Sequence, residues 1–197
     1  MTAQRYILKP EFGRLMRKVQ QGLRGFRWCL IGGRAVEVWT NPPQTPDADI
    51  LAGVTDDAVP LIVDRFGKLG VEVRDAKTGL GAPLLFFEDV QLHIELDVLG
   101  AYAPLHDFVL ESAQSRTLHG IRIKVATPAA LVLLKAEAAV DPSRAKHVRD
   151  VNAILAVARA QKLDPDYLES AIQVCDMPVE RKLLVRLGIL KETDRAD

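Results

Sequence analysis

Two glycines between an apolar segment and an amphipathic one are the first candidates for chemistry in this sequence. Residues 27–31 read as a short strand and residues 34–39 as a helical segment, so Gly32 and Gly33 fall in a strand-to-helix turn. Backbone N–H groups are exposed where a helix begins, and glycine lets an anion approach them closely. The turn therefore indicates a phosphate-binding site, although a Gly-Gly pair after a strand is in itself common.

Two carboxylates follow the glycines at a spacing that places them side by side. Asp47 and Asp49 begin a segment that reads as a strand ending near Val54, and alternate side chains of a strand share a face. Neighbouring carboxylates repel each other unless a cation lies between them, and a hard divalent cation prefers oxygen ligands. The pair therefore indicates a divalent metal. The alternative is a solvent-exposed edge strand.

A third carboxylate, Asp97, lies in the most regular strand pattern of the chain. Residues 90–99 alternate between apolar and polar side chains, which puts His93, Glu95 and Asp97 together on one face. Plain solvent exposure of this face is the alternative. If Asp47 and Asp49 bind a cation, Asp97 is the candidate for a third ligand.

A lysine interrupts an otherwise apolar helix. Thr127 is a good N-cap for a helix over residues 128–140, whose interior contains Lys135. A buried ammonium group is strongly unfavourable without a partner, so Lys135 either reaches water or pairs with phosphate or a carboxylate such as Asp150. Asp150 belongs to a second helix, predicted over residues 141–162. The predicted buried stripe of that helix is Val148, Val151, Leu155 and Ala158.

The remaining periodicity indicates the elements that position these residues. Further strands are predicted at 71–74 and 84–87, with a hairpin over 116–125, and further helices at 10–23, 55–66, 105–113, from 164 onwards and at 178–188. Loops are predicted at 40–46, beside the site, and at 76–83. The pattern predicts an α+β fold. A mixed sheet of about five strands flanked by helices would occupy residues 1–125, and a helical bundle residues 126–197.

The composition of the chain argues against some classes of function. The 197 residues contain 26 Lys and Arg and 26 Asp and Glu, so no net charge draws the chain onto nucleic acid. No apolar run approaches the ~20 residues that span a bilayer, and the first residues do not read as a secretory signal. We therefore expect a cytoplasmic protein with no membrane contact. Cys29 and Cys175 lack metal-ligand spacing and are expected to be buried thiols.

The chain resembles the nucleotidyltransferase superfamily of the DNA polymerase beta type and, more narrowly, the AbiEii-like nucleotidyltransferases of toxin and antitoxin pairs. The motifs that carry the resemblance are Leu30-Ile31-Gly32-Gly33, Thr45-Pro46-Asp47-Ala48-Asp49, Leu96-Asp97-Val98-Leu99, Ala126-Thr127-Pro128 with Leu134-Lys135, and Arg144-Ala145-Lys146 with Asp150-Val151. Two positions depart from the pattern. Relatives often carry an arginine where this chain has Pro42-Pro43-Gln44, and an acidic residue where His147 stands.

The resemblance implies roles for the motif residues. It assigns Gly32, Gly33, Arg34, Thr45 and Lys135 to the nucleotide, with Arg34 in place of the missing arginine. It assigns Asp47, Asp49 and Asp97 to two Mg²⁺ ions, with Mn²⁺ as the substitute. Asp150 would orient Lys135 or form an ion pair with it.

The implied activity is transfer of a nucleoside monophosphate from an NTP to a hydroxyl of an RNA, such as a tRNA, or of a protein. The protein would be the toxin of a pair whose partner is an antitoxin protein. The alternative is a non-catalytic module of the same fold that binds a nucleotide or a partner protein. The missing arginine favours this alternative, and the three carboxylates oppose it.

Overall fold

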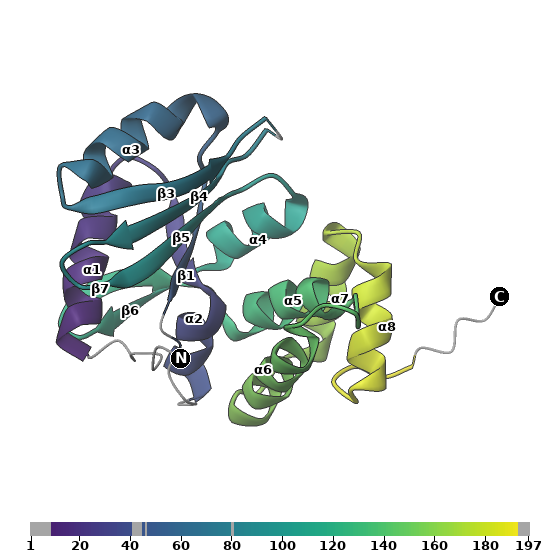
Figure 1. Cartoon of the computed structure of the whole chain (residues 1–197). Coiled ribbons are helices and arrows are strands. Elements are labelled where there is room, and N and C mark those ends of the chain that lie inside the picture. Colours follow the sequence, from purple (N-terminus) through teal and green to yellow (C-terminus); the bar gives the residue numbers. More distant parts are fainter. Residues whose placement is uncertain (1–8, 41–44, 46, 80, 193–197) are drawn as a thin grey trace.

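The computed structural model of the chain describes residues 9–40, 45, 47–79 and 81–192. Its strands form a seven-stranded mixed sheet in the order β3-β4-β5-β2-β1-β7-β6 (Figure 1). The strands are β1 (Trp28–Ile31), β2 (Ala48–Ala52), β3 (Val71–Lys77), β4 (Leu84–Asp89), β5 (Ile94–Gly100), β6 (Gln114–Leu118) and β7 (Ile121–Val125). The central strand β2 is antiparallel to β1 and parallel to β5. The structure therefore confirms the predicted mixed sheet, but with seven strands instead of about five.

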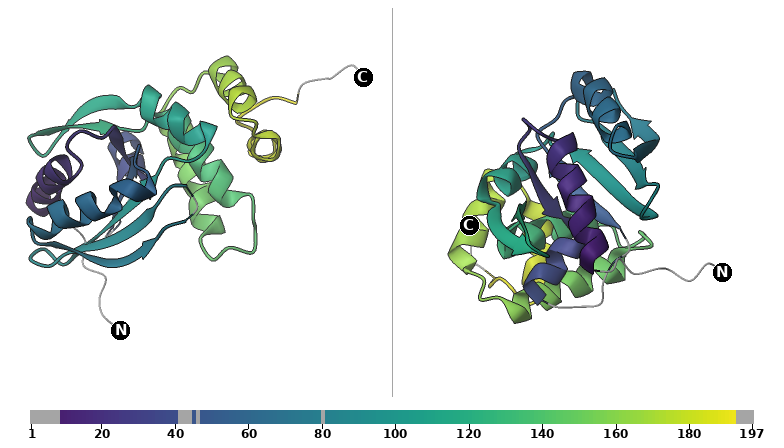
Figure 2. Two further views of the ribbon diagram at one scale, coloured as in Figure 1. Left: turned by 90° about the horizontal axis from the view of Figure 1, so that it is seen from above. Right: turned by 90° about the vertical axis from the view of Figure 1, so that its left-hand side faces the viewer.

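Helices cover the sheet and form a separate group at the C-terminal end. They are α1 (Lys9–Gly22), α2 (Gly32–Thr40), α3 (Val59–Gly67), α4 (Pro104–Ser112), α5 (Pro128–Ala139), α6 (His147–Ala160), α7 (Pro165–Val174) and α8 (Pro178–Arg186). Figure 2 shows α1 and α3 on one side of the sheet and the helices α5 to α8 beyond it on the other. The helices that flank the sheet and the C-terminal helical group both agree with the sequence. A division into two units near residue 125 stays a prediction.

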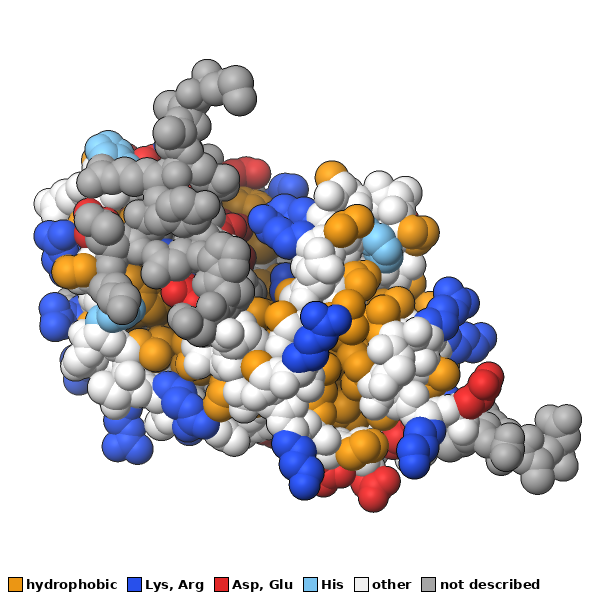
Figure 3. All heavy atoms as spheres, turned by 90° about the horizontal axis from the view of Figure 1, so that it is seen from below, with side chains coloured by type: hydrophobic (Ala, Val, Ile, Leu, Met, Phe, Trp, Pro, Cys, Tyr) orange, Lys and Arg blue, Asp and Glu red, His pale blue; other side chains and the backbone are white. Residues whose placement is uncertain are grey.

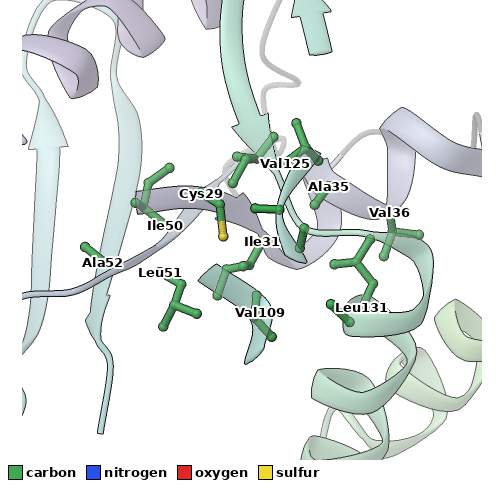
Figure 4. Packing of buried hydrophobic residues seen from close by; sticks show 14 of the residues in the cluster. Cys29, Ile31, Ala35, Val36, Ile50, Leu51, Ala52, Val109, Val125 and Leu131 are labelled. Atoms are coloured by element: carbon green, nitrogen blue, oxygen red, sulfur yellow. The ribbon is translucent and has the colours of Figure 1, made fainter. Parts of the chain in front are cut away.

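One apolar core connects the sheet to the C-terminal helices. Ile31 of β1, Val36 of α2, Val109 of α4 and Leu131 of α5 all belong to the same buried cluster. Figure 4 shows Leu131 near Val36, with Val109 and Ile31 in the same cluster. Full burial of one such side chain contributes about 2 kcal/mol, so α5 is held firmly against the sheet.

Capping residues in the sequence predicted the start of two helices correctly. The Thr127 hydroxyl accepts a hydrogen bond from the Ala130 backbone N–H at 3.3 Å, and α5 begins there as predicted. Asp164 caps α7 by accepting bonds from the Asp166 and Tyr167 backbone N–H groups. Each cap provides an acceptor for an N–H that has no partner within its helix. The two cysteines are buried, as expected.

The strand predicted over residues 90–99 is wrong in its first half. β4 continues to Asp89, residues 90–93 form the turn, and β5 begins only at Ile94. The Asp89 carboxylate accepts hydrogen bonds from the backbone N–H groups of Gln91 and Leu92, and His93 adopts a positive φ of 52°. An aspartate that binds the backbone two and three residues on favours a turn over a strand. His93 therefore does not share the strand face of Asp97.

The start of the helix predicted over residues 55–66 is also different. A 3₁₀ turn spans Asp56–Ala58, and α3 begins at Val59. The Thr55 hydroxyl donates to the Asp57 carboxylate and does not cap the backbone. Pro60 lies in the first turn of α3, where its fixed φ and missing N–H suit a helix start.

The helix predicted over residues 141–162 begins later and is rotated. Asp141 accepts hydrogen bonds from Ser143 within a turn, and α6 begins at His147. Its buried residues are Asp150, Ile154 and Val157, whereas Val148 of the predicted stripe is exposed. These buried positions follow i, i+4 and i+7 spacing, so one face of α6 carries Asp150 inward. The packing of α6 against α5 and α2 decides this rotation.

Within the described residues, no helix is long and apolar enough to cross a membrane. The predicted loop residues 41–44 and the last residues 193–197 lie outside the described part of the chain.

Candidate active site

The three predicted carboxylates meet on neighbouring strands. Ile31 of β1 pairs with Asp49 of β2, and Asp49 pairs with Asp97 of β5. Ile31, Asp49 and Asp97 therefore form one row across the sheet. Asp47 lies one residue before β2, two positions from Asp49. Strand pairing therefore brings Asp97 beside Asp49 although 48 positions separate them in the sequence.

The carboxylates shift one another's protonation. Burial, followed by the charges of Asp47 and Asp97, raises the pKa of Asp49 from 3.8 to about 6, against the opposing effect of Lys135 and Lys146. Burial likewise raises the pKa of Asp97 to about 6, with contributions from Asp47 and Glu95 against Lys146. Carboxylates that are both desolvated and crowded have a high affinity for protons or cations. The cluster is thus poised to bind positive charge.

Glycine is required at the helix start by the protein's own side chains. Gly32 has a φ of +66°, and a Cβ added there would lie 1.8 Å from the Asp49 carboxylate oxygen Oδ2. A Cβ added at Gly33 would lie 2.3 Å from the Thr45 Cγ2 atom. The two glycines therefore let the first turn of α2 pack directly against Asp49 and Thr45, which places its backbone N–H groups beside the carboxylates.

Lys135 and Asp150 form the ion pair that the sequence suggested. The Lys135 Nζ atom donates to Asp150 Oδ1 at 2.7 Å, and their side chains are 19% and 3% exposed. The inward rotation of α6 makes this pair possible. The positive charge of Lys135 also lowers the pKa of Asp49.

These residues share one cavity of about 600 Å³ between the sheet and the C-terminal helices. One wall carries Gly32, Gly33, Thr45, Asp47 and Asp49, and the opposite wall carries Lys135, Arg144, Lys146, Arg149 and Asp150. Figure 3 shows the same arrangement on the surface, with acidic side chains on one side of a hollow and Lys and Arg side chains on the other. An acidic wall that faces a basic one suits a polyanion that arrives with divalent cations.

Two predicted site residues stand apart from the cavity. Asp97 and Arg34 are not among the described residues that line it. Arg34 is buried, with its Nη1 atom 2.8 Å from Glu37 Oε2 and its Cζ atom 5.3 Å from the centre of the Phe12 ring. Its role in nucleotide binding stays a prediction.

Sequence reasoning missed part of the lining. Arg144 and Lys146 belonged to a recognised motif but received no role, and the basic run that continues to Arg149 was the available signal. Tyr102 and His106 also line the cavity. No local pattern marks them, because they enter the site only through the position of α4.

The donor set fits a divalent cation shared with a substrate. The described residues contain no group of three or more His, Cys, Asp or Glu side chains that could hold a metal ion unaided. Mg²⁺ is usually bound by one or two carboxylates together with substrate phosphates and water, and not by a complete protein cage. The two carboxylates that line the cavity, Asp47 and Asp49, match this mode, and Asp97 lies on the neighbouring strand.

Comparison with known families decides the affiliation. A family model described as nucleotidyl transferase AbiEii toxin, type IV toxin–antitoxin system, matches residues 16–177. The chain belongs to the AbiEii family. The AbiEii-family protein is therefore a nucleotidyltransferase, as its motifs indicated, and nucleotidyltransferases generally use divalent metal ions. A comparison with curated protein sequences gave no significant match.

Solved structures share the fold at low identity. The solution structure of the antibiotic-resistance factor ANT(2″)-Ia superposes with a TM-score of 0.59 at 13% identity, covering 92% of this chain and 95% of that one. The lincomycin-bound lincosamide antibiotic adenylyltransferase LnuA gives 0.56 at 12% identity, covering 80% and 100%. An antigenic nucleotidyltransferase-like protein from Paracoccidioides brasiliensis gives 0.54 at 15% identity, covering 91% and 92%. These likenesses confirm the nucleotidyltransferase fold of the AbiEii-family chain.

Proposed function

We propose that this AbiEii-family protein transfers a nucleoside monophosphate from an NTP to a hydroxyl of an RNA or a protein, with Mg²⁺ as the cofactor. It would act in the cytoplasm as a toxin that an antitoxin protein restrains. The observation that carries the proposal is one cavity lined by the Gly32-Gly33 turn, Asp47 and Asp49 together with Lys135 and the basic residues Arg144, Lys146 and Arg149.

The triphosphate is proposed to lie between the two walls. The backbone N–H groups at the start of α2, released for contact by Gly32 and Gly33, suit the phosphate oxygens, and Thr45 packs against the same turn. From the opposite wall Lys135, Arg144 and Lys146 would neutralise phosphate charge. Charge-assisted contacts of this kind are about twice as strong as neutral hydrogen bonds.

Asp47 and Asp49, with Asp97 beside them, are proposed to hold two Mg²⁺ ions, with Mn²⁺ as the substitute. When bound, the ions supply polarisation of the α-phosphate and stabilisation of the departing pyrophosphate. The acceptor oxygen forms a bond to the α-phosphorus, the bond from that phosphorus to the bridging oxygen breaks, and pyrophosphate leaves. Asp97 would take the proton of the acceptor hydroxyl.

Asp150 is proposed as a positioning residue. Its carboxylate holds the Lys135 ammonium group at 2.7 Å and would keep it directed at the phosphates. Because Lys135 and Asp150 belong to the helical part, transfer would require that part to stay docked on the sheet. This is the proposed meaning of a unit over residues 126–197 beside a core over residues 1–125.

Labelled NTPs test the proposal. The protein is incubated with each α-labelled NTP and Mg²⁺ together with total cellular RNA, total cellular protein, tobramycin or lincomycin. Label on RNA or protein is the expected result. Label on an antibiotic would replace this acceptor class by the one that the names of LnuA and of ANT(2″)-Ia with adenylyl-2″-tobramycin suggest for those proteins.

The rival function is a non-catalytic module. Calorimetry with Mg²⁺ and each NTP separates the two functions, because a module binds a nucleotide without releasing pyrophosphate in the presence of any acceptor. Tight binding without transfer to any of the four acceptor pools would refute the proposed activity.

A further inference from the structure

Tyr102 and His106 form a wall of the cavity to which the proposed function assigns nothing. Tyr102 is 65% exposed and lies between β5 and α4, and His106 lies in the first turns of α4. Their ring centres are 4.5 Å apart with an interplanar angle of 83°, so the tyrosine ring stands edge-on to the imidazole. Both rings line the cavity that holds Asp47 and Asp49.

His106 has a defined hydrogen-bonding role. The Tyr102 backbone N–H donates to His106 Nδ1 at 3.3 Å, so the neutral ring carries its proton on Nε2. Burial lowers the pKa of His106, against the effect of Asp107, and this keeps the ring neutral. The side chain is 1% exposed, and no hydrogen bond of Nε2 occurs among the described residues. Because His106 lines the cavity and its Nε2–H has no protein acceptor among these residues, this donor is available to a ligand that carries an acceptor atom.

Apolar side chains line the same cavity as the two rings. They include Leu99, Leu131 and Leu134. The segment before Tyr102 is fixed to the sheet, because the Ala101 backbone N–H donates to the Ala52 carbonyl at 2.8 Å. Leu99 lies two residues beyond Asp97 on β5, and the same cavity is lined by Asp47 and Asp49. A planar ring would lose little by leaving water here, and the site needs little reorganisation to receive it.

An exposed aromatic side chain by itself needs no explanation, since single apolar residues are common on protein surfaces. Tyr102 differs because it lines a cavity of about 600 Å³ beside the imidazole of the buried His106. We propose that Tyr102 and His106 form a nucleobase subsite, in which the tyrosine ring stacks on the base and His106 Nε2–H donates to a ring nitrogen or carbonyl oxygen. This subsite rests on the proposed function. It adds to that function the residues that would recognise the nucleobase.

A nucleobase can come from the incoming NTP or from an RNA acceptor, and the test separates the two sources. Isothermal titration in Mg²⁺ measures the binding of ATP, GTP, CTP and UTP, of a set of RNA dinucleotides, and of inorganic tripolyphosphate. The full-length variants are Tyr102→Ala and Tyr102→Phe. Tyr167→Ala is the matched control, because Tyr167 is also an exposed tyrosine beside α4, 5.8 Å from Phe108, and does not line the cavity.

Tyr102→Ala should weaken base-dependent binding roughly fivefold to one-hundredfold, the range for loss of one base-aromatic stack. Tyr102→Phe and Tyr167→Ala should bind like wild type, and tripolyphosphate, which has no ring, should bind all variants equally. Loss confined to the NTPs identifies the donor base, and loss confined to the dinucleotides identifies an acceptor base.

Four results would overturn the subsite: wild type that binds none of the ring-bearing probes, unchanged affinities in Tyr102→Ala, equal losses in Tyr102→Ala and Tyr102→Phe, or equal losses for tripolyphosphate. The proposed function fails differently, through the absence of any labelled acceptor in the transfer assay, so each can fail without the other.

Discussion

Asp49→Asn should make the metal-free protein more stable while abolishing transfer. Burial and the neighbouring carboxylates raise the pKa of Asp49 from 3.8 to about 6. A shift of that size corresponds to ~3 kcal/mol of destabilisation once the group is ionised. Asparagine has the same shape and carries no charge, so it removes this cost and leaves the contact with Gly32 unchanged. For a chain of this length the gain is roughly 6–12 °C in Tm.

The effect has a definite pH window. Between about pH 4 and pH 6 the folded protein holds the Asp49 proton and the unfolded chain does not, so wild-type stability falls as pH rises through this interval. The advantage of the asparagine variant is therefore small near pH 4 and complete at pH 8. The proposed Mg²⁺ site uses the folded carboxylates, so Mg²⁺ should raise the Tm of wild type more than that of the variant.

Thermal unfolding followed by circular dichroism, in EDTA at pH 4.5 and pH 8 and then with Mg²⁺, measures these shifts. Asp64→Asn is the matched control, because Asp64 is an exposed aspartate of α3 whose loss should change stability by about 0.5 kcal/mol or less. The reasoning is refuted if Asp49→Asn melts markedly below wild type at pH 8 in EDTA, since the carboxylate would then be structural.

Further predictions concern the ion pair, the glycine turn and the metal. Lys135→Met should lower the free energy of unfolding by roughly 3 kcal/mol, because Asp150 stays buried without its cation. The double variant Lys135→Met, Asp150→Leu should recover this stability, but its NTP affinity should stay at least tenfold reduced. Normal affinity and turnover in the double variant would remove Lys135 from the site. Gly32→Ala should abolish transfer by displacing Asp49, whereas Gly120→Ala, which shares a positive φ but has open space for a Cβ, should cost only about 1 kcal/mol of stability; equal activity in the two variants would contradict this. EDTA should stop transfer and either Mg²⁺ or Mn²⁺ should restore it, and label incorporated in EDTA would rule out a metal-dependent reaction.

Residue spacing alone determined the features that depend on local chemistry. The Gly32-Gly33 turn and the cap at Thr127 follow from backbone geometry and from side chains that bind adjacent N–H groups. The order of the motifs was enough to identify the family, because the short motifs around Asp47, Asp49 and Asp97 occur in the strand context that the family requires.

Tertiary structure decided everything that depends on how elements meet. The phase of α6 cannot be read from its own residues, because Asp150 turns inward only when Lys135 of α5 faces it. The β4–β5 turn fell later than predicted because Asp89 binds the following backbone, a competition that alternating apolar residues conceal.

The cavity itself shows the same division. Its carboxylates and glycines belong to recognisable motifs, but Tyr102 and His106 enter it through the docking of α4 beside β5 and α5. Arg34, adjacent to the glycines in sequence, turns instead toward Glu37 and Phe12. Neighbouring residues of a helix point in different directions. The sequence therefore showed which residues can carry the chemistry. Only the packing of the helices on the sheet decided which of them line the same cavity.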